Sequence, residues 1–330
     1  MTGVQTCALP ILIVIDPIRT GLASMADIWL QIKPGHDGLL AMSMIHEIIS
    51  KNLFDEGFVK EWTVGFEALK EAAKDFDAGE IAERLWLKPE EIRNVARVYA
   101  VTKPACIIDG NGLDMQLNVF QQTRGLCILR GLTGNVDKPG GDLIPQAIPV
   151  RNIQLKERLS KEIKSIAQDY PLFNTFHETW GINAQSCVID AILDEKPYPL
   201  KMLVVQSGNP AVTMADAGRA IKAFKQLEFM VVLDLFMTRT AKMAHVVLPA
   251  CSSFEKTQLN RAFIRNNPVL LQNQVIDWVE DSWPDWKITF ELARRLGMDK
   301  EFPWQSAEEA IDYQLEPAGI SVDKIGRAHV

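Results

Sequence analysis

The sequence predicts an α/β protein with two domains, each built on a mainly parallel sheet that is covered by helices on both faces. Short unbroken apolar runs, typical of strands buried on both faces, alternate with segments whose apolar residues recur at the helical period. The alternation occurs in both halves of the 330 residues, and strands separated by helices form parallel βαβ units. A chain of this length can bury two cores of ordinary size.

In the first half, the predicted strands are short apolar runs that lead into turn residues. The predicted helices carry apolar residues three and four positions apart, and Pro89, followed by two glutamates, marks the start of one of them. In chain order the elements are a strand at 12–15 (LIVI), a strand at 27–30 (DIWL), a helix opening at 33–38 (KPGHDG), a helix from 89 (PEEI), a strand at 105–109 (ACIID) and a helix at 120–132.

In the second half, three further apolar runs predict strands, at 202–206 (MLVVQ), 229–234 (FMVVLD) and 246–248 (VVL). A helix after the first of these is expected to be capped by Thr213, with Asp216 three residues further on. A last helix is expected at 284–297, with Ser282 as its cap and Gly297 as its stop.

The composition excludes several classes of function. A net charge of −7 argues against a nucleic-acid partner, since such binding depends on neutralising phosphates. No apolar run approaches the roughly 20 residues of a spanning helix, so we expect no direct membrane insertion. No CxxC pair occurs, and His36, His46 and His177 lack metal-ligand spacing, so we expect no metal site within this stretch. The cysteines interpreted as packing residues are Cys106, Cys127, Cys187 and Cys251.

The chain is expected to divide near residue 150, after which the composition becomes more charged and less periodic as far as Lys201. The predicted domains span 12–150 and 151–324. The end segments 1–11 (MTGVQTCALPI) and 325–330 (IGRAHV) resemble translated sequencing-adapter sequence and are excluded from the fold prediction. On this interpretation the chain is an internal fragment of a longer protein; the alternative is a pair of disordered tails.

Loops rich in Gly, Asp and Asn follow several predicted strands and lead into helices. Ligands of open α/β sheets bind outside the carboxyl ends of the strands, where helix N-termini offer free N–H groups. A nucleotide-like ligand is therefore expected, although none of the loops is a complete Walker or GxGxxG motif. Asp16, Asp37 and Asp234 can each accept the paired N1–H and N2–H donors of guanine; the alternative for each is a helix-cap or turn role.

Five motifs follow one another along the chain: IDPIRT at 15–20, IKPGHDGLLAMSMIHEII at 32–49, GLTGNVDKPGG at 131–141, SGNPAVT at 207–213 and VVLDLFMTRTAKMAHVVLPA at 231–250. Together they resemble the middle of a molybdopterin oxidoreductase catalytic subunit of the dimethyl sulfoxide reductase superfamily. The resemblance extends over nearly all of 12–300. The superfamily includes formate dehydrogenases, nitrate and thiosulfate reductases, and acetylene hydratase.

The resemblance implies a bis(molybdopterin guanine dinucleotide) cofactor with molybdenum or tungsten, held between two Rossmann-like αβα domains. It also implies a small-molecule substrate and an iron–sulfur electron-transfer subunit as partners. An iron–sulfur cluster and the metal-ligating residue are expected only in an N-terminal region that precedes this stretch. The residues that match cofactor-contacting positions are Asp16, Pro17, Arg19 and Thr20 at a nucleotide end, Pro34, Gly35 and Asp37 at a guanine, Gly110 and Gly112 near the pterin, and Gly208, Asn209, Pro210, Asp234 and Thr238 at the second dinucleotide.

The chain departs from the family pattern at three places. His245 stands where the family usually has an aspartate, and we expect it to be neutral, hydrogen-bonded and structural. The segment 256–262 lacks the usual Gly-Thr and Asn-x-Glu-Gly-Arg pattern. Arg151 lies near the place of an active-site arginine in some members, but its spacing differs, so a surface or interdomain role is the alternative to a catalytic one.

Three functions are open at this point. The first is a fragment of a molybdenum or tungsten oxidoreductase that binds the guanosine ends of the cofactor and is inactive alone. The second is a non-redox hydratase like acetylene hydratase on the same scaffold. The third is a pterin-free structural or electron-transfer subunit, such as the large iron–sulfur subunit of respiratory NADH dehydrogenase. The presence of Asp37, Asn209, Asp234 and Thr238 argues against it.

Overall fold

The computed structural model describes residues 10–144, 146–158, 165–171, 174, 185–261 and 269–325. The chain forms two compact units, Met1–Ile144 and Pro145–Val330, whereas the sequence prediction places the division near residue 150. Each unit is described by itself. Cys7, His177 and nearly all of the adapter-like ends lie outside the described residues.

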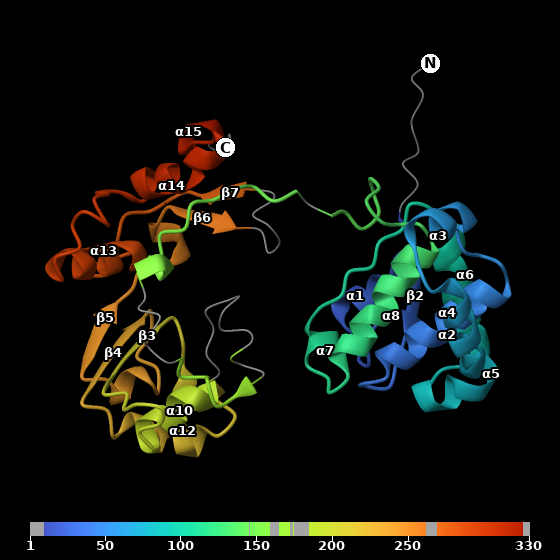
Figure 1. Ribbon diagram of the computed structural model, residues 1–330, viewed down its shortest axis with the longest axis horizontal. Helices are drawn as coiled ribbons and strands as arrows, with labels where there is room; N and C mark the ends of the chain where they lie inside the picture. Colours follow the sequence, from blue (N-terminus) through green and yellow to red (C-terminus); the bar gives the residue numbers. More distant parts are fainter. Residues whose placement is uncertain are drawn as a thin grey trace. The chain divides into compact units, whose positions relative to one another are not determined.

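The first unit consists mainly of helices beside a small parallel sheet (Figure 1). Its two strands pair in parallel, with Ile13 opposite Ile28 and Ile15 opposite Leu30. The elements are β1 (Ile13–Ile15), α1 (Gly21–Met25), β2 (Ile28–Leu30), α2 (Asp37–Ser50), α3 (Glu56–Trp62), α4 (Phe66–Ala72), η1 (Ala73–Phe76), α5 (Ala78–Ile81), η2 (Ala82–Leu85), α6 (Pro89–Val101), α7 (Asn111–Asp114) and α8 (Val119–Leu132).

Helix α2 forms the centre of this unit's core. Ile45 and Ile48 are fully buried, and the helix packs against α6 and α8. The approach of α8 is close, because a Cβ added at Gly125 would lie 3.0 Å from the Cβ of Ala41. Glycine at this position therefore sets the distance between α2 and α8.

The strand predicted at 105–109 is wrong. The backbone amides of this segment do not pair with a neighbouring strand: that of Ala105 donates to Oδ1 of Asn135 (3.2 Å) and that of Ile107 to Oδ2 of Asp142 (3.4 Å). The carbonyl of Ile107 accepts from the guanidinium of Arg130 at 2.9 Å. Polar side chains thus satisfy the backbone groups that a sheet would otherwise have paired.

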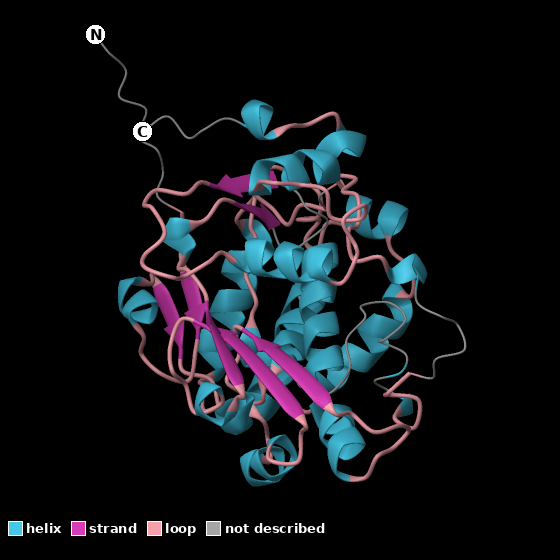
Figure 2. Ribbon diagram, turned by 90° about the vertical axis from the view of Figure 1, so that its left-hand side faces the viewer, coloured by secondary structure: helices cyan, strands magenta, loops and turns pink. Residues whose placement is uncertain are grey.

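The second unit contains a parallel sheet in the order β3–β4–β5 and a separate antiparallel pair, β6–β7 (Figures 1 and 2). Helices α10 and α12 share one buried core with the parallel sheet. The elements are η3 (Lys156–Arg158), α10 (Gln185–Leu193), β3 (Met202–Gln206), α11 (Pro210–Thr213), α12 (Ala217–Phe224), β4 (Phe229–Asp234), η4 (Ala241–Met243), β5 (Val246–Pro249), η5 (Ser253–Glu255), β6 (Gln258–Arg261), β7 (Val269–Gln272), α13 (Asp285–Arg295), α14 (Ala307–Leu315), η6 (Glu316–Ala318) and α15 (Val322–Ile325).

The three parallel strands end together. Gln206 lies opposite Leu233, and Asp234 lies opposite Pro249, so the loops after β3, β4 and β5 leave the same edge of the sheet. The segment before α13 extends this edge, because Trp283 forms a parallel bridge with Ala250. The predicted α/β class with mainly parallel sheets is confirmed, and the β6–β7 hairpin is an addition that the sequence did not indicate.

Two predicted helix caps are wrong. Asp216, not Thr213, caps α12, because its Oδ1 accepts from the amide of Arg219 (2.9 Å), whereas Thr213 ends α11. Ser282 does not cap α13; its hydroxyl donates to Val279 (2.7 Å) and contacts Glu255. The predicted stop at Gly297 is confirmed by its left-handed φ of +80° just beyond the helix.

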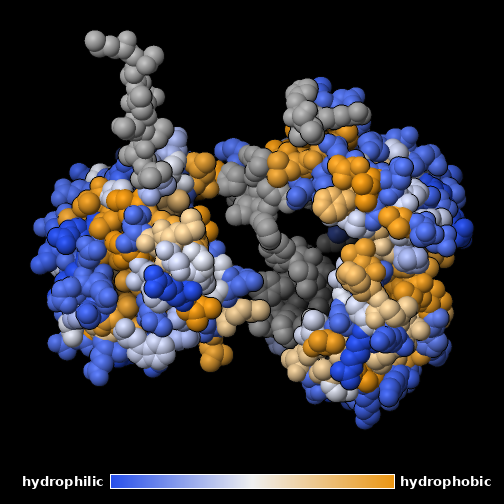
Figure 3. Space-filling model, turned by 180° about the vertical axis from the view of Figure 1, so that it is seen from behind, coloured by the Kyte–Doolittle hydropathy of each residue, from blue (hydrophilic) through white to orange (hydrophobic). Residues whose placement is uncertain are grey.

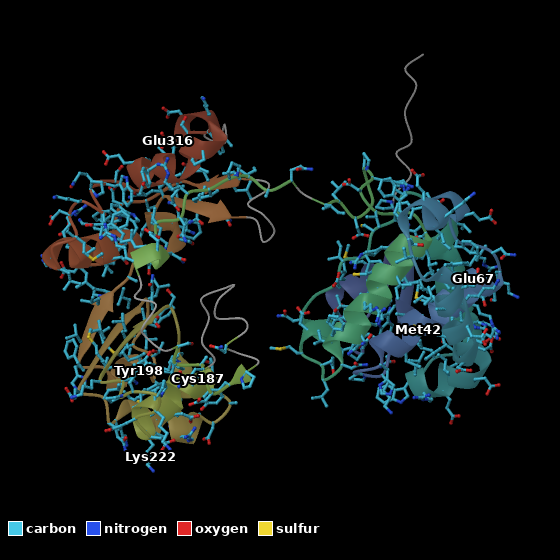
Figure 4. The ribbon with its side chains drawn as sticks, viewed as in Figure 1. Met42, Glu67, Cys187, Tyr198, Lys222 and Glu316 are labelled. Carbon is cyan, nitrogen blue, oxygen red and sulfur yellow. The ribbon has the colours of Figure 1, made fainter. Side chains whose placement is uncertain are left out.

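The packing role predicted for the cysteines holds for two of them. Cys187, labelled in Figure 4, and Cys251 are buried. Cys106 and Cys127 are exposed, so the packing prediction is wrong for them: the former lies in the irregular 105–109 segment. Within the described residues, no helix is long and apolar enough to span a bilayer.

Candidate functional site

A cavity of about 430 Å³ opens where the three parallel strands of the second unit end. Such an edge is where ligands bind in open α/β sheets. The cavity is lined by Ser207, Gly208 and Asn209 after β3, by Asp234 and Leu235 at the end of β4, by Ala250, Cys251 and Ser253 after β5, and by Lys256, Gln258 and Asp285. The structure therefore brings together Gly208, Asn209 and Asp234, three of the predicted cofactor contacts.

Asn209 braces the loop that follows β3. Its Oδ1 accepts from both the amide (3.2 Å) and the hydroxyl (2.7 Å) of Thr240, which is fully buried. The hydroxyl oxygen of Thr240 in turn accepts from the amide of Ala211 at 3.0 Å. The amide oxygen of Asn209 is thus used within the protein, and only its Nδ2 group is left for a ligand among the contacts of the described residues.

Asp234, the last residue of β4, keeps one carboxylate oxygen open. Its Oδ1 accepts from the amide of Phe236 at 3.0 Å, as in the predicted turn role. Within the part of the chain that the structure describes, Oδ2 accepts no hydrogen bond. One residue thus combines the turn role with a carboxylate oxygen available to a donor in the cavity.

Apolar side chains stand beside this carboxylate. Leu235, Phe236 and Met237 follow Asp234 directly, and all three are exposed. Apolar surface is present on both units (Figure 3). Of the three, Leu235 lines the cavity, and a carboxylate beside an apolar side chain suits a flat ring system with hydrogen-bond donors on its edge.

Lys256 and Asp285 form a sheltered ion pair in the cavity wall. The ammonium lies 2.5 Å from Oδ2 of Asp285, and the side chains are 17% and 19% exposed. The other oxygen of Asp285 accepts from Nε2 of Gln206 at 3.0 Å. Burial opposes ionisation of Asp285, but the hydrogen bonds from Lys256 and Gln206 outweigh it and lower the pKa of the carboxyl.

Glu255 connects the loop after β5 to the segment before α13. Glu255 is buried, and its carboxylate accepts from the hydroxyl (2.6 Å) and amide (2.8 Å) of Ser252 and from the amide of Val279 (2.7 Å), while the hydroxyl oxygen of Ser282 lies 3.2 Å away. These hydrogen bonds, led by that from the Ser252 hydroxyl, lower the pKa of Glu255 to about 2. The sequence prediction missed this residue, although the SSFE capping box at 252–255 was a readable signal.

The other two predicted contacts of this unit, Pro210 and Thr238, are not among the cavity-lining residues. Pro210 is the first residue of α11. The hydroxyl of Thr238 accepts from the amide of Ala241, the first residue of η4, at 3.1 Å. Both shape the loops that carry Asn209 and Asp234.

In the first unit, Asp16, Pro17, Arg19 and Thr20 follow β1 closely, as the sequence indicated. Oδ1 of Asp16 accepts from the amide of Ile18 (2.9 Å), and Thr20 caps α1 through the amide of Ala23 (3.1 Å). The guanidinium of Arg19 lies 5.7 Å from the centroid of the Trp29 ring. These residues therefore have local structural partners at the strand end.

Asp37, the first residue of α2, differs from these. It makes no ion pair with a Lys or Arg in the described part of the chain, and burial raises the pKa of its carboxyl despite a hydrogen bond with its own amide. The preceding turn, which contains Pro34, requires Gly35 at a φ of +77°. A half-buried carboxylate with no lysine or arginine partner in the described part of the chain is suited to a ligand that brings hydrogen-bond donors.

Gly110 and Gly112 lie at the start of α7, and a Cβ at either would meet nothing within 4 Å. This leaves room for a ligand near the backbone. The base of the loop is held by Arg130, which pairs with Asp109 (2.6 Å) and Asp142 (3.2 Å).

Arg151 lies against α14 rather than in the cavity. Its NH1 is 2.6 Å from Oε2 of Glu316, which is labelled in Figure 4. Its guanidinium carbon is 4.2 Å from the centroid of the Tyr313 ring. These contacts occupy the side chain within the second unit and favour the surface or interdomain interpretation.

His245 is hydrogen-bonded, as predicted. Its Nδ1 accepts from the amide of Met230 at 2.9 Å, so this nitrogen carries no proton, and the ring stacks on Phe229. Both partners lie at the start of β4, at the edge of the sheet opposite the cavity. Among the described residues, no three His, Cys, Asp or Glu side chains are grouped to hold a metal ion.

Comparison with known proteins gives one family. A family model described as Molybdopterin oxidoreductase matches residues 11–295. Acetylene hydratase from Syntrophotalea acetylenica is 31% identical over 94% of this chain and 46% of its own length. An F420-dependent formate dehydrogenase subunit alpha from Methanocaldococcus jannaschii is 33% identical over 90% of this chain and 45% of its own length.

Further relatives carry redox activities in their names. The thiosulfate reductase molybdopterin-containing subunit of Salmonella typhimurium is 28% identical over 91% of this chain. The solved structure of acetylene hydratase from Pelobacter acetylenicus matches with a TM-score of 0.79 and 30% identity, over 94% of this chain and 46% of that one. The chain thus spans about half the length of the relatives it matches.

Proposed function

The chain belongs to the molybdopterin oxidoreductase family, and from this premise we propose that it is the part of a catalytic subunit that binds the guanosine ends of a bis(molybdopterin guanine dinucleotide) with molybdenum or tungsten. The observation that carries the proposal is the cavity at the ends of β3, β4 and β5, with the open carboxylate oxygen of Asp234 in it. When bound, the cofactor would supply a metal centre that exchanges electrons or an oxygen atom with a small-molecule substrate.

The residues of this chain would bind and orient the cofactor. A carboxylate pairs with the N1–H and N2–H donors of guanine and rejects adenine, which presents one donor group and an acceptor on that edge. Asp234 in the second unit and Asp37 in the first supply one such carboxylate each, and neither is neutralised by a lysine or arginine in the described parts of the chain. Gly208 lines the cavity of the second unit, and Gly110 and Gly112 in the first unit leave room for the rest of a dinucleotide near the backbone.

The reaction, the substrate and the partners belong to the whole protein. We propose that its remaining part supplies the metal-ligating residue and an iron–sulfur cluster, and that the chain by itself is inactive. Relatives named as alpha or molybdopterin-containing subunits support an electron-transfer partner. A pterin-free structural subunit would have no use for carboxylates without a lysine or arginine partner at the end of β4 and at the start of α2.

Hydration is the second candidate. It is favoured by the match to acetylene hydratase, in sequence (31% identity) and in structure (TM-score 0.79). The two candidates differ in electron flow: an oxidoreductase reduces or oxidises a dye coupled to its substrate, whereas a hydratase adds water without net electron transfer. Dye-linked turnover of the complete protein decides between them.

The binding proposal is tested with the 330-residue chain and three nucleotides of equal charge: GMP, IMP, which lacks the 2-amino group, and AMP. We expect binding, measured by calorimetry, in the order GMP, IMP, AMP, with about tenfold lost at the first step because one hydrogen bond to a carboxylate disappears. Asp234→Asn should abolish the preference of the second unit. Asp216→Asn, which alters a helix-capping aspartate of the same unit, should keep it. Equal binding of GMP and AMP would exclude the proposal.

A further inference from the structure

The cavity holds one cation whose hydrogen-bonding capacity is mostly unused. Lys256 is the only Lys or Arg among the described residues that line it. Its side chain is 17% exposed, and its ammonium contacts Asp285 at 2.5 Å. An ammonium has three N–H donors, and this contact occupies one of them.

The two members of the ion pair are not equivalent. Both oxygens of Asp285 are engaged, one by Lys256 and one by Gln206. Asp285 is therefore satisfied by the protein, whereas Lys256 retains two donors without a protein acceptor within the described residues. A sheltered donor on a charged group is costly unless an acceptor meets it, so the free side of Lys256 is suited to an oxyanion.

We propose that Lys256 is the anion-contacting residue of this cavity and takes a phosphate oxygen of the bound ligand, while Asp285 holds its ammonium in the wall. The inference rests on the proposed function in that the phosphate belongs to the dinucleotide whose base meets Asp234. The contact between Lys256 and a phosphate oxygen does not require the guanine base. Inorganic pyrophosphate is therefore a probe that tests Lys256 separately from Asp234.

The two members of the ion pair should have opposite effects on anion binding. Removing the lysine removes the attraction for the anion, whereas removing the charge of Asp285 frees the ammonium from its competing carboxylate. The two substitutions should therefore change pyrophosphate affinity in opposite directions. A pair with a purely structural role would weaken binding in both variants, through loss of the same contact.

The experiment is calorimetric titration of the 330-residue chain with pyrophosphate at low salt, with thermal unfolding recorded for every variant. We expect Lys256→Gln to weaken binding about tenfold or more, Lys256→Arg to retain it, and Asp285→Asn to tighten it roughly fivefold. Lys201→Gln is the matched control, because Lys201 pairs with Glu228 at 2.7 Å at the opposite edge of the same sheet. It should leave pyrophosphate affinity unchanged.

Several results would overturn the inference: no binding of pyrophosphate to the wild-type chain, unchanged binding in folded Lys256→Gln, or weaker binding in both Lys256→Gln and Asp285→Asn. The proposed function fails differently. If pyrophosphate responds as expected but GMP, IMP and AMP bind equally, the anion contact stands and the guanine contact of Asp234 does not. Asp234→Asn itself should not reduce pyrophosphate binding, since it removes a negative charge from the cavity.

Discussion

The hydroxyl of Thr240 donates to Oδ1 of Asn209 at 2.7 Å, and this bond joins the loop that follows β3 to the loop that follows β4. The backbone amide of Thr240 donates to the same oxygen at 3.2 Å. Because Thr240 is fully buried, water cannot replace either bond. Together with the pairing of β3 and β4, these bonds fix the loop of Asn209 against the loop that follows Asp234.

The substitution Thr240→Val keeps the shape of this side chain but removes its hydroxyl. It leaves the amide of Ala211 without its acceptor, and we expect a loss of about 1–3 kcal/mol in the free energy of unfolding. Urea denaturation measures it. The control is Thr213→Val, whose exposed hydroxyl bonds to the carbonyl of Asn209 and should cost no more than about 0.5 kcal/mol. Equal losses in the two variants would contradict the role of Thr240.

The lowered pKa of Glu255 predicts that the folded state loses stability in acid. Its folded pKa of about 2 lies below the ordinary 4.5, so between these values the unfolded state binds more protons and stability falls as the pH falls. The contribution is fully present above about pH 4.5 and lost toward pH 2. Glu255→Gln should therefore be less stable than the wild type at pH 6, with a difference that shrinks between pH 4.5 and pH 2.

Denaturation at a series of pH values measures this difference. The control is Glu228→Gln, which alters an exposed ion pair on the same unit and should follow the wild-type curve closely. A constant gap between Glu255→Gln and the wild type from pH 6 to pH 2 would contradict the argument.

The strand ends could be predicted from the sequence because buried parallel strands are unbroken apolar runs. The runs MLVVQ and FMVVLD end at Gln206 and Asp234, where the structure ends β3 and β4. The ion pair of Lys256 with Asp285 could not be predicted, since the two residues are 29 positions apart and no local pattern connects them. The conformation of the segment 105–109 could not be predicted either. Its apolar residues indicated a strand, but hydrogen bonds to distant side chains hold it in an irregular conformation.

The contact between α2 and α8 predicts opposite effects for two glycines on the same helix. Gly125→Ala would place a Cβ 3.0 Å from that of Ala41 and should cost about 1–3 kcal/mol. Gly131→Ala, in open space on α8, should be neutral or should stabilise by up to about 1 kcal/mol. Denaturant unfolding measures both.

A second substitution tests whether the cost at Gly125 comes from this contact. Ala41→Gly in the Gly125→Ala background should recover part of the loss. The contact then again contains one methyl group, which is carried by α8 instead of α2. Additive losses in the double variant would contradict a steric cause.

Asp37 and Asp55 both stand at helix starts of the first unit, yet their carboxyl pKa values shift in opposite directions. Burial raises that of Asp37, whereas the hydrogen bond from the amide of Phe58 and the nearby ammonium of Lys103 lower that of Asp55. A raised folded pKa means that the folded state binds the proton more readily, so ionisation of Asp37 at neutral pH lowers stability. Asp37→Asn should therefore be at least as stable as the wild type at pH 7, with any gain lost below about pH 4, while Asp55→Asn should be less stable. Denaturation at both pH values measures this, and a loss of stability at pH 7 in Asp37→Asn would show that its charge supports the fold rather than being held for a ligand.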